Sequence, residues 1–163
     1  MTERFKVNEA EQFLLRFPDI RAGLNKSRFV AENWPVAVDI VEAPDQIGRL
    51  FTCFRISLGR INPHFLHWLR VRNMTVAEAV RRIDRMPSAE RRTVLSFATE
   101  FRRQPNASLE LPCYRLSDGN SLILDGNHHA VALALSGRTS KVVLHCIEGP
   151  MDESAIKGIE LCR

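Results

Sequence analysis

The sequence lacks most of the features that place a chain in a special class. No apolar run approaches the roughly 18–20 residues that a membrane span needs, and residues 1–6 lack the apolar region of a secretion signal. The four cysteines are spread out without a Cys-x-x-Cys pair, so we expect them to be reduced and mostly buried. These absences predict a cytoplasmic protein without membrane contact.

Several common catalytic loops are also missing. The chain has no Walker motif, no Gly-x-Gly-x-x-Gly and no Gly-x-Ser-x-Gly, which removes the sequence signatures of P-loop, dinucleotide-binding and α/β-hydrolase proteins. Lysine is scarce, with 4 against 19 arginines, and nine of those arginines fall in residues 70–103 beside four acids. Two interpretations of this segment remain open: a surface that attracts nucleic acid, or solvated helices with local ion pairs.

What is present predicts a globular chain with both helices and strands. At 163 residues, 45% apolar and 26% charged, it can bury one core of useful size. Asn8 is a plausible N-cap for a helix that ends before Pro18. Residues 36–42 are largely β-branched and predict a strand. Residues 43–48 are expected to form a loop or short turn.

The middle of the chain predicts a second strand over residues 51–58, followed by three helices. The first helix begins at Asn62-Pro63, an N-cap and first-turn pair. Thr75 and Glu78 form a capping box that opens the second helix. Ser88 is expected to cap the third, which ends near residue 104.

The last third predicts an antiparallel hairpin and then a strand–helix–strand unit. Strands over residues 109–116 and 121–124 flank a turn at residues 117–120. A helix follows Asp125-Gly126 and ends at Gly137, and a further strand covers residues 141–147. The predicted fold class is therefore α+β, a small mixed β-sheet with surrounding helices.

The junction at Asp125-Gly126-Asn127-His128-His129 is the strongest functional signal. A strand that turns directly into a helix points the first backbone N–H groups of that helix outward, and these suit an anion such as phosphate. Asp125 has two interpretations, as a general base or metal anchor, and as an Asx-turn or N-cap residue. Gly126 allows a positive φ or the close approach of a ligand.

This turn, with the Ala- and Leu-rich helix after it, resembles the Asp-Gly-x-His-Arg turn of the ParB/sulfiredoxin superfamily. Residues 55–63, 111–116 and 142–146 are similar to other strands of that family. The resemblance implies a compact mixed sheet over residues 51–148. It leaves residues 1–50 as an N-terminal extension, a helix plus a strand packed on the core, and residues 149–163 as a C-terminal tail.

The resemblance also implies a nucleotide site. Gly126 and Asn127 would cradle phosphate, and His128 and His129 would contact it; histidine at 129 replaces the usual arginine, which predicts weaker, pH-dependent binding. Asn127 stands where sulfiredoxins carry their catalytic cysteine, so sulfiredoxin activity is not expected. Further contacts are expected from Arg60, Asn62 and His64.

Three functions follow as hypotheses. The first is a nucleotide-binding protein that takes ATP, ADP or CTP, with Mg²⁺ held through Asp125. It would act on a small molecule, either as a kinase-like phosphotransferase or as a nucleotide hydrolase. Asp125 and His128 would be its catalytic residues. The second is a DNA-binding or nuclease-like protein that uses the arginine-rich segment. The third is a non-catalytic regulator or scaffold. A homodimer is compatible with each of them.

Overall fold

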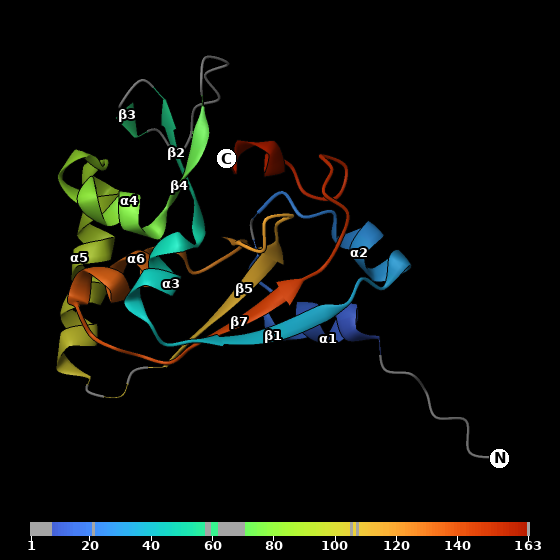
Figure 1. Ribbon diagram of the computed structural model, residues 1–163, viewed down its shortest axis with the longest axis horizontal. Helices are drawn as coiled ribbons and strands as arrows, with labels where there is room; N and C mark the ends of the chain where they lie inside the picture. The colour runs from blue at the N-terminus through green and yellow to red at the C-terminus, as the bar shows by residue number, and fades with distance from the viewer. Residues whose placement is uncertain are drawn as a thin grey trace.

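In this computed structural model, the described residues are 8–20, 22–57, 60–61, 71–104, 106 and 108–162. Their strands form one seven-stranded mixed sheet with the order β1-β7-β5-β6-β2-β3, and β4 pairs with β2. Figure 1 shows the helices arranged around this sheet. The predicted α+β class is therefore confirmed.

The described residues of the first half of the chain form three helices and four strands. The helices are α1 (Glu9–Arg16), α2 (Lys26–Glu32) and α3 (Pro44–Arg49), and the strands are β1 (Val36–Val41), β2 (Phe51–Ser57), β3 (Arg60–Ile61) and β4 (Arg72–Thr75). The predicted loop over residues 43–48 is wrong, since α3 occupies most of it. Pro44 lies in the first turn of α3, where its missing N–H costs nothing, and Ile47 is buried.

The second half supplies the remaining elements. The helices are α4 (Val76–Arg81), α5 (Ser88–Arg103) and α6 (Asn127–Ser136), with short 3₁₀ turns η1 (Ile83–Arg85) and η2 (Ile159–Leu161); the strands are β5 (Leu109–Arg115), β6 (Ser121–Ile123) and β7 (Val142–Ile147). The capping box of Thr75 and Glu78 is confirmed. Ser88 is not the cap that we predicted, because Pro87 takes the N-cap position and Ser88 is already helical.

Strand pairing explains how the sheet is both mixed and compact. β5 and β6 form the predicted antiparallel hairpin, and β5 also pairs in parallel with β7. β5 thus lies between the two strands that α6 connects. β1 pairs antiparallel with β7 over six residues, so the segment before residue 50 contributes an edge strand to the same sheet.

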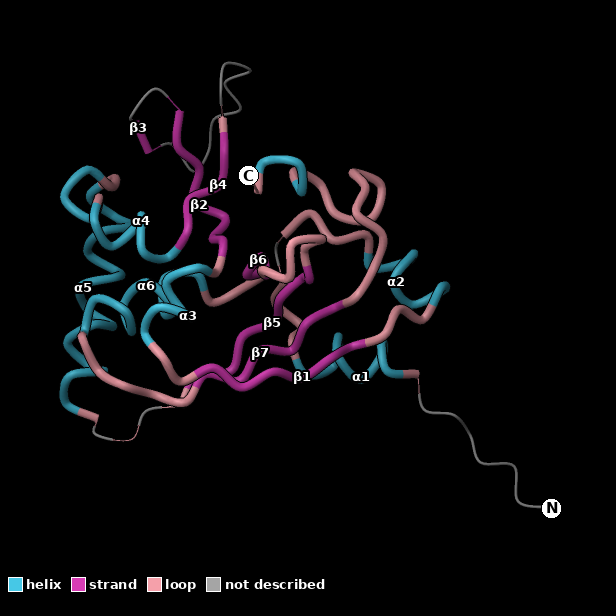
Figure 2. Tube along the Cα trace, viewed as in Figure 1, coloured by secondary structure: helices cyan, strands magenta, loops and turns pink. Residues whose placement is uncertain are grey.

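Alternate residues of the central strands face two separate cores. Leu111 and Cys113 of β5 join a cluster with α3, α4, α5 and α6. Tyr114 and Leu116 face the other way, into a cluster with α1, α2 and the C-terminal segment. This alternation is the period-two pattern of a sheet that is covered on both faces. Figure 2 shows the two groups of helices at opposite ends of the view.

The four cysteines are free thiols, and Cys113 and Cys146 are buried. Cys53, Cys113 and Cys146 lie on β2, β5 and β7, in the strand contexts expected for them. None of the helices in the described part of the chain has the length and apolar character to cross a membrane.

Candidate functional site

The Asp-Gly turn connects β6 to α6 as the sequence predicts. Gly126 is the N-cap residue of α6 and has a left-handed conformation with φ of 81°, which glycine adopts without steric cost. A Cβ at this position would lie 2.8 Å from Cδ2 of the buried Leu111. Gly126 therefore meets both a conformational and a packing requirement. Gly137, also left-handed, ends α6.

Asp125 is exposed and is not the N-cap of α6. Its Oδ1 accepts a hydrogen bond from the Gly126 N–H at 2.8 Å. Among the described residues its carboxylate has no other hydrogen bond and no ion pair, so most of its acceptor capacity is available to a ligand.

Asn127 joins α6 to the neighbouring strand. Its Oδ1 accepts a hydrogen bond from the backbone N–H of Cys53 at 2.8 Å. This bond connects the first residue of α6 to β2 and fixes the position of the helix N-terminus against the sheet. The side chain of Asn127 thus has a structural role. Its backbone N–H is one of the first-turn groups that have no partner within α6.

The two histidines point to different environments. His128 Nε2 contacts a carboxylate oxygen of Glu90 on α5, and its ring packs edge-on against Phe54 at 5.2 Å between centroids. His129 instead stacks on Phe97 of α5 at 3.9 Å. Burial lowers the pKa of His129, and the neighbouring His128 adds to the effect.

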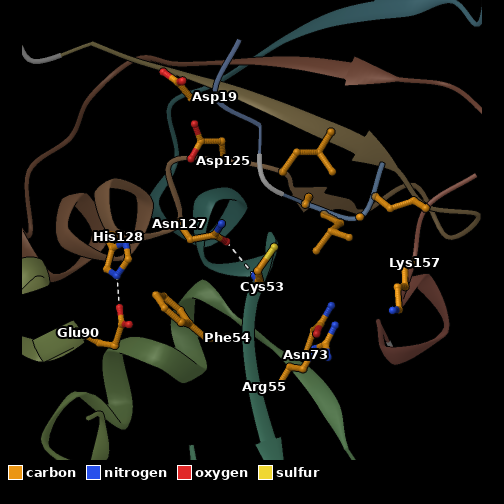
Figure 3. A pocket seen from close by; sticks show the side chains of 15 residues that line it. Asp19, Cys53, Phe54, Arg55, Asn73, Glu90, Asp125, Asn127, His128 and Lys157 are labelled. Carbon is orange, nitrogen blue, oxygen red and sulfur yellow. Dashed lines mark hydrogen bonds and ion pairs between the residues drawn. The ribbon is translucent and has the colours of Figure 1, made fainter. Parts of the chain in front are cut away.

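A cavity of about 740 Å³ opens beside this turn. Its walls come from the β2, β4 and β6 strands, the turn with the start of α6, α5, the segment before α2 and the C-terminal segment (Figure 3). The described residues that line it are Asp19, Ala22, Gly23, Cys53, Phe54, Arg55, Asn73, Glu90, Leu122, Leu124, Asp125, Asn127, His128, Ile156 and Lys157. Three of the predicted site residues, Asp125, Asn127 and His128, are therefore brought together on one wall.

The charged groups of the cavity lie at two ends. In Figure 3, Asp19, Asp125 and Glu90 lie on the left, and Arg55 and Lys157 on the right. We call these the turn end and the basic end. Within the described part of the chain, neither Arg55 nor Lys157 has a hydrogen-bonded or ion-paired side-chain partner.

The basic end contains a buried acceptor as well. Asn73 is directly opposite Arg55 in the β2–β4 pairing and is 3% exposed. Its Nδ2 donates to Cys162 Sγ at 3.2 Å, while its Oδ1 is buried without a partner among the described residues. An unsatisfied buried carbonyl is costly, so this atom is a candidate for a ligand or side-chain donor.

The cavity cysteine is not an activated nucleophile. Burial raises the pKa of Cys53, and burial also raises the pKa of nearby Cys162 to about 11. Both groups are therefore thiols at neutral pH, whereas a nucleophilic cysteine needs the thiolate.

Of the other predicted contacts with a histidine or arginine side chain, the structure places His129. His129 lies outside the lining, against Phe97. Arg60 is in β3, paired with Ser57, and its side chain, like the whole of Asn62 and His64, lies outside the described residues. Among the described residues no group of three or more His, Cys, Asp or Glu side chains could hold a metal.

The arginine-rich segment divides among several elements. Arg72 is on β4 and pairs with Glu78, and Arg102 on α5 donates to the Leu135 carbonyl. These two arginines serve structural contacts. Glu90, counted among the acids of this segment, turns inward to His128.

The sequence did not identify the charged and amide side chains that line the cavity outside the turn, namely Asp19, Arg55, Asn73, Glu90 and Lys157. They come from five separate segments, and no regular spacing in the sequence connects them.

Compared with known protein families, with curated proteins and with solved structures, the chain matches none.

Proposed function

We propose that this chain is a ParB/sulfiredoxin-like protein that binds a nucleotide in the cavity beside the Asp125–His129 turn. The observation that carries the proposal is that one cavity is lined by the turn and by two cations, Arg55 and Lys157, that have no side-chain partner among the described residues. Its volume of about 740 Å³ falls within the roughly 300–1,000 Å³ that is typical of small-molecule sites.

The chemistry of the walls supports the same class of ligand. The first turn of α6 offers backbone N–H groups, which favour an anion, and Arg55 and Lys157 supply formal positive charge. Leu122, Leu124 and Ile156 also belong to the lining and, although each is at most 3% exposed, they make part of the cavity wall apolar. A nucleotide combines these requirements in one molecule.

The test is calorimetric titration with ATP, ADP, CTP and GTP, each with and without Mg²⁺. We expect saturable binding of at least one of them, weakened about tenfold or more in the double variant Asp125→Ala, His128→Ala, because each lost polar contact to a charged group contributes about 1.5–3 kcal/mol.

The matched control is Asp45→Ala, His145→Ala, which removes the same two residue types outside the cavity. Both variants are first checked by circular dichroism. Absence of binding by all four nucleotides to the folded wild-type protein would refute the proposal.

A further inference from the structure

Two features of the cavity attract phosphate, and they lie at different ends. The N-terminus of α6 is at the turn end, whereas Arg55 and Lys157 are at the basic end (Figure 3). The charges around each feature determine which of the two is the better phosphate site. The resemblance to ParB/sulfiredoxin proteins predicts phosphate at the turn.

Carboxylates surround the turn end. Asp19 and Asp125 line the cavity, and the described residues place no cation against either of them. Glu90 lies on the same wall and engages Nε2 of His128, so this nitrogen is not available as a phosphate donor. Like charges at close range oppose the binding of a phosphate, and carboxylates accept hydrogen bonds from hydroxyl and amino groups.

The basic end has the opposite character. Nη2 of Arg55 approaches the backbone at Gly158 so closely that a Cβ there would lie 2.9 Å away. The guanidinium therefore lies next to the residue that follows Lys157. Gly158 has a φ of 84°, a conformation that favours glycine, and its lack of a Cβ leaves room for the guanidinium.

The buried Oδ1 of Asn73 completes this corner. Arg55 and Asn73 are cross-strand neighbours on one face of the sheet, and that oxygen lacks a partner among the described residues. A guanidinium has five N–H donors, and a bidentate contact with phosphate uses only two of them. Arg55 can therefore bind phosphate and still donate to Asn73.

We infer that the phosphates bind at Arg55 and Lys157, and that the hydroxyl or amino groups of the sugar or base meet Asp19, Asp125 and the Glu90–His128 pair. The inference rests on the proposed function for the identity of the ligand. It reverses the orientation that the resemblance implies, because the turn receives the neutral part of the nucleotide.

The test uses inorganic pyrophosphate, which has the phosphates without sugar or base, in calorimetric titrations without Mg²⁺. We compare the wild type with Arg55→Gln, Lys157→Gln, with Asp125→Asn, and with the control Arg49→Gln, Lys141→Gln, which removes the same two charge types elsewhere. We expect pyrophosphate affinity to fall about tenfold or more only in the first variant. Asp125→Asn should weaken the nucleotide but leave pyrophosphate binding equal or tighter.

The outcomes separate the two proposals. Nucleotide binding that the Arg55, Lys157 change leaves intact would overturn this inference and leave the proposed function standing. Pyrophosphate binding that depends on both cations, in a protein that binds no nucleotide, would support the basic end as a phosphate site and refute the proposed function. Binding of neither ligand would overturn both.

Discussion

Replacing Gly126 with alanine tests whether the turn is fixed by both conformation and packing. A left-handed conformation costs a non-glycine residue about 1–2 kcal/mol, and Gly126 has a φ of 81°. The new Cβ would also lie 2.8 Å from Leu111 Cδ2, and overpacking of a full core costs about 1–3 kcal/mol. We therefore expect Gly126→Ala to lower the free energy of unfolding by about 2–5 kcal/mol.

Gly119 offers a matched control. It has a φ of 84°, but a Cβ there would meet no atom within 4 Å, so Gly119→Ala should cost only the conformational part, about 1–2 kcal/mol. Urea unfolding followed by circular dichroism gives both values, and the excess of about 1–3 kcal/mol measures the contact. Adding Leu111→Ala should remove most of that excess. Equal losses at the two glycines would refute the packing part of the argument.

Two further predictions concern stability. Thr75→Ala should lower the free energy of unfolding by about 0.5–2 kcal/mol, because the Thr75 side chain caps α4. The control Thr99→Ala, on the exposed side of α5, should lower it less in the same urea assay. Burial lowers the pKa of His129, so its stabilising contribution is complete above the unfolded value of about 6.5 and is lost as pH falls below it. His129→Gln should therefore flatten part of the decline in the urea midpoint below pH of about 6.5, and an unchanged slope would contradict this.

The sequence predicted those elements that depend on local contacts. The junction at Gly126 and Gly137 was predictable because both glycines act through the backbone of neighbouring residues. The capping box of Thr75 was predictable for the same reason. The helix α3 was not, because Pro44 and Gly48 are typical of turns, and what stabilises α3 is the burial of Ile47 in the core.

In the candidate site, too, the residues that could be predicted from the sequence are those that depend on local contacts. Asp125, Asn127 and His128 were identified because they follow one another at a strand–helix junction, which favours anions, and because this turn resembles that of the ParB/sulfiredoxin superfamily. Glu90 reaches His128 across 38 positions of sequence, and Arg55 and Lys157 line the same cavity only because the C-terminal segment packs beside β2. Contacts between segments that are distant in the sequence depend on strand order and helix packing, which no local sequence pattern predicts.

The charges of the cavity that have no partner among the described residues are one structural argument for the proposed ligand. Three other half-buried arginines are paired, Arg28 with Asp152, Arg72 with Glu78 and Arg115 with Asp39. The half-buried Arg82 and Arg91 have no side-chain partner among the described residues. Arg55 is likewise half-buried without a carboxylate partner among the described residues, and unlike those two it lines the cavity. A partly desolvated charge without a partner costs free energy, and an apolar side chain at this position of β2 would avoid that cost. At the proposed phosphate site, a bound anion would supply the partner that Arg55 lacks among the described residues, and the pyrophosphate titration tests this.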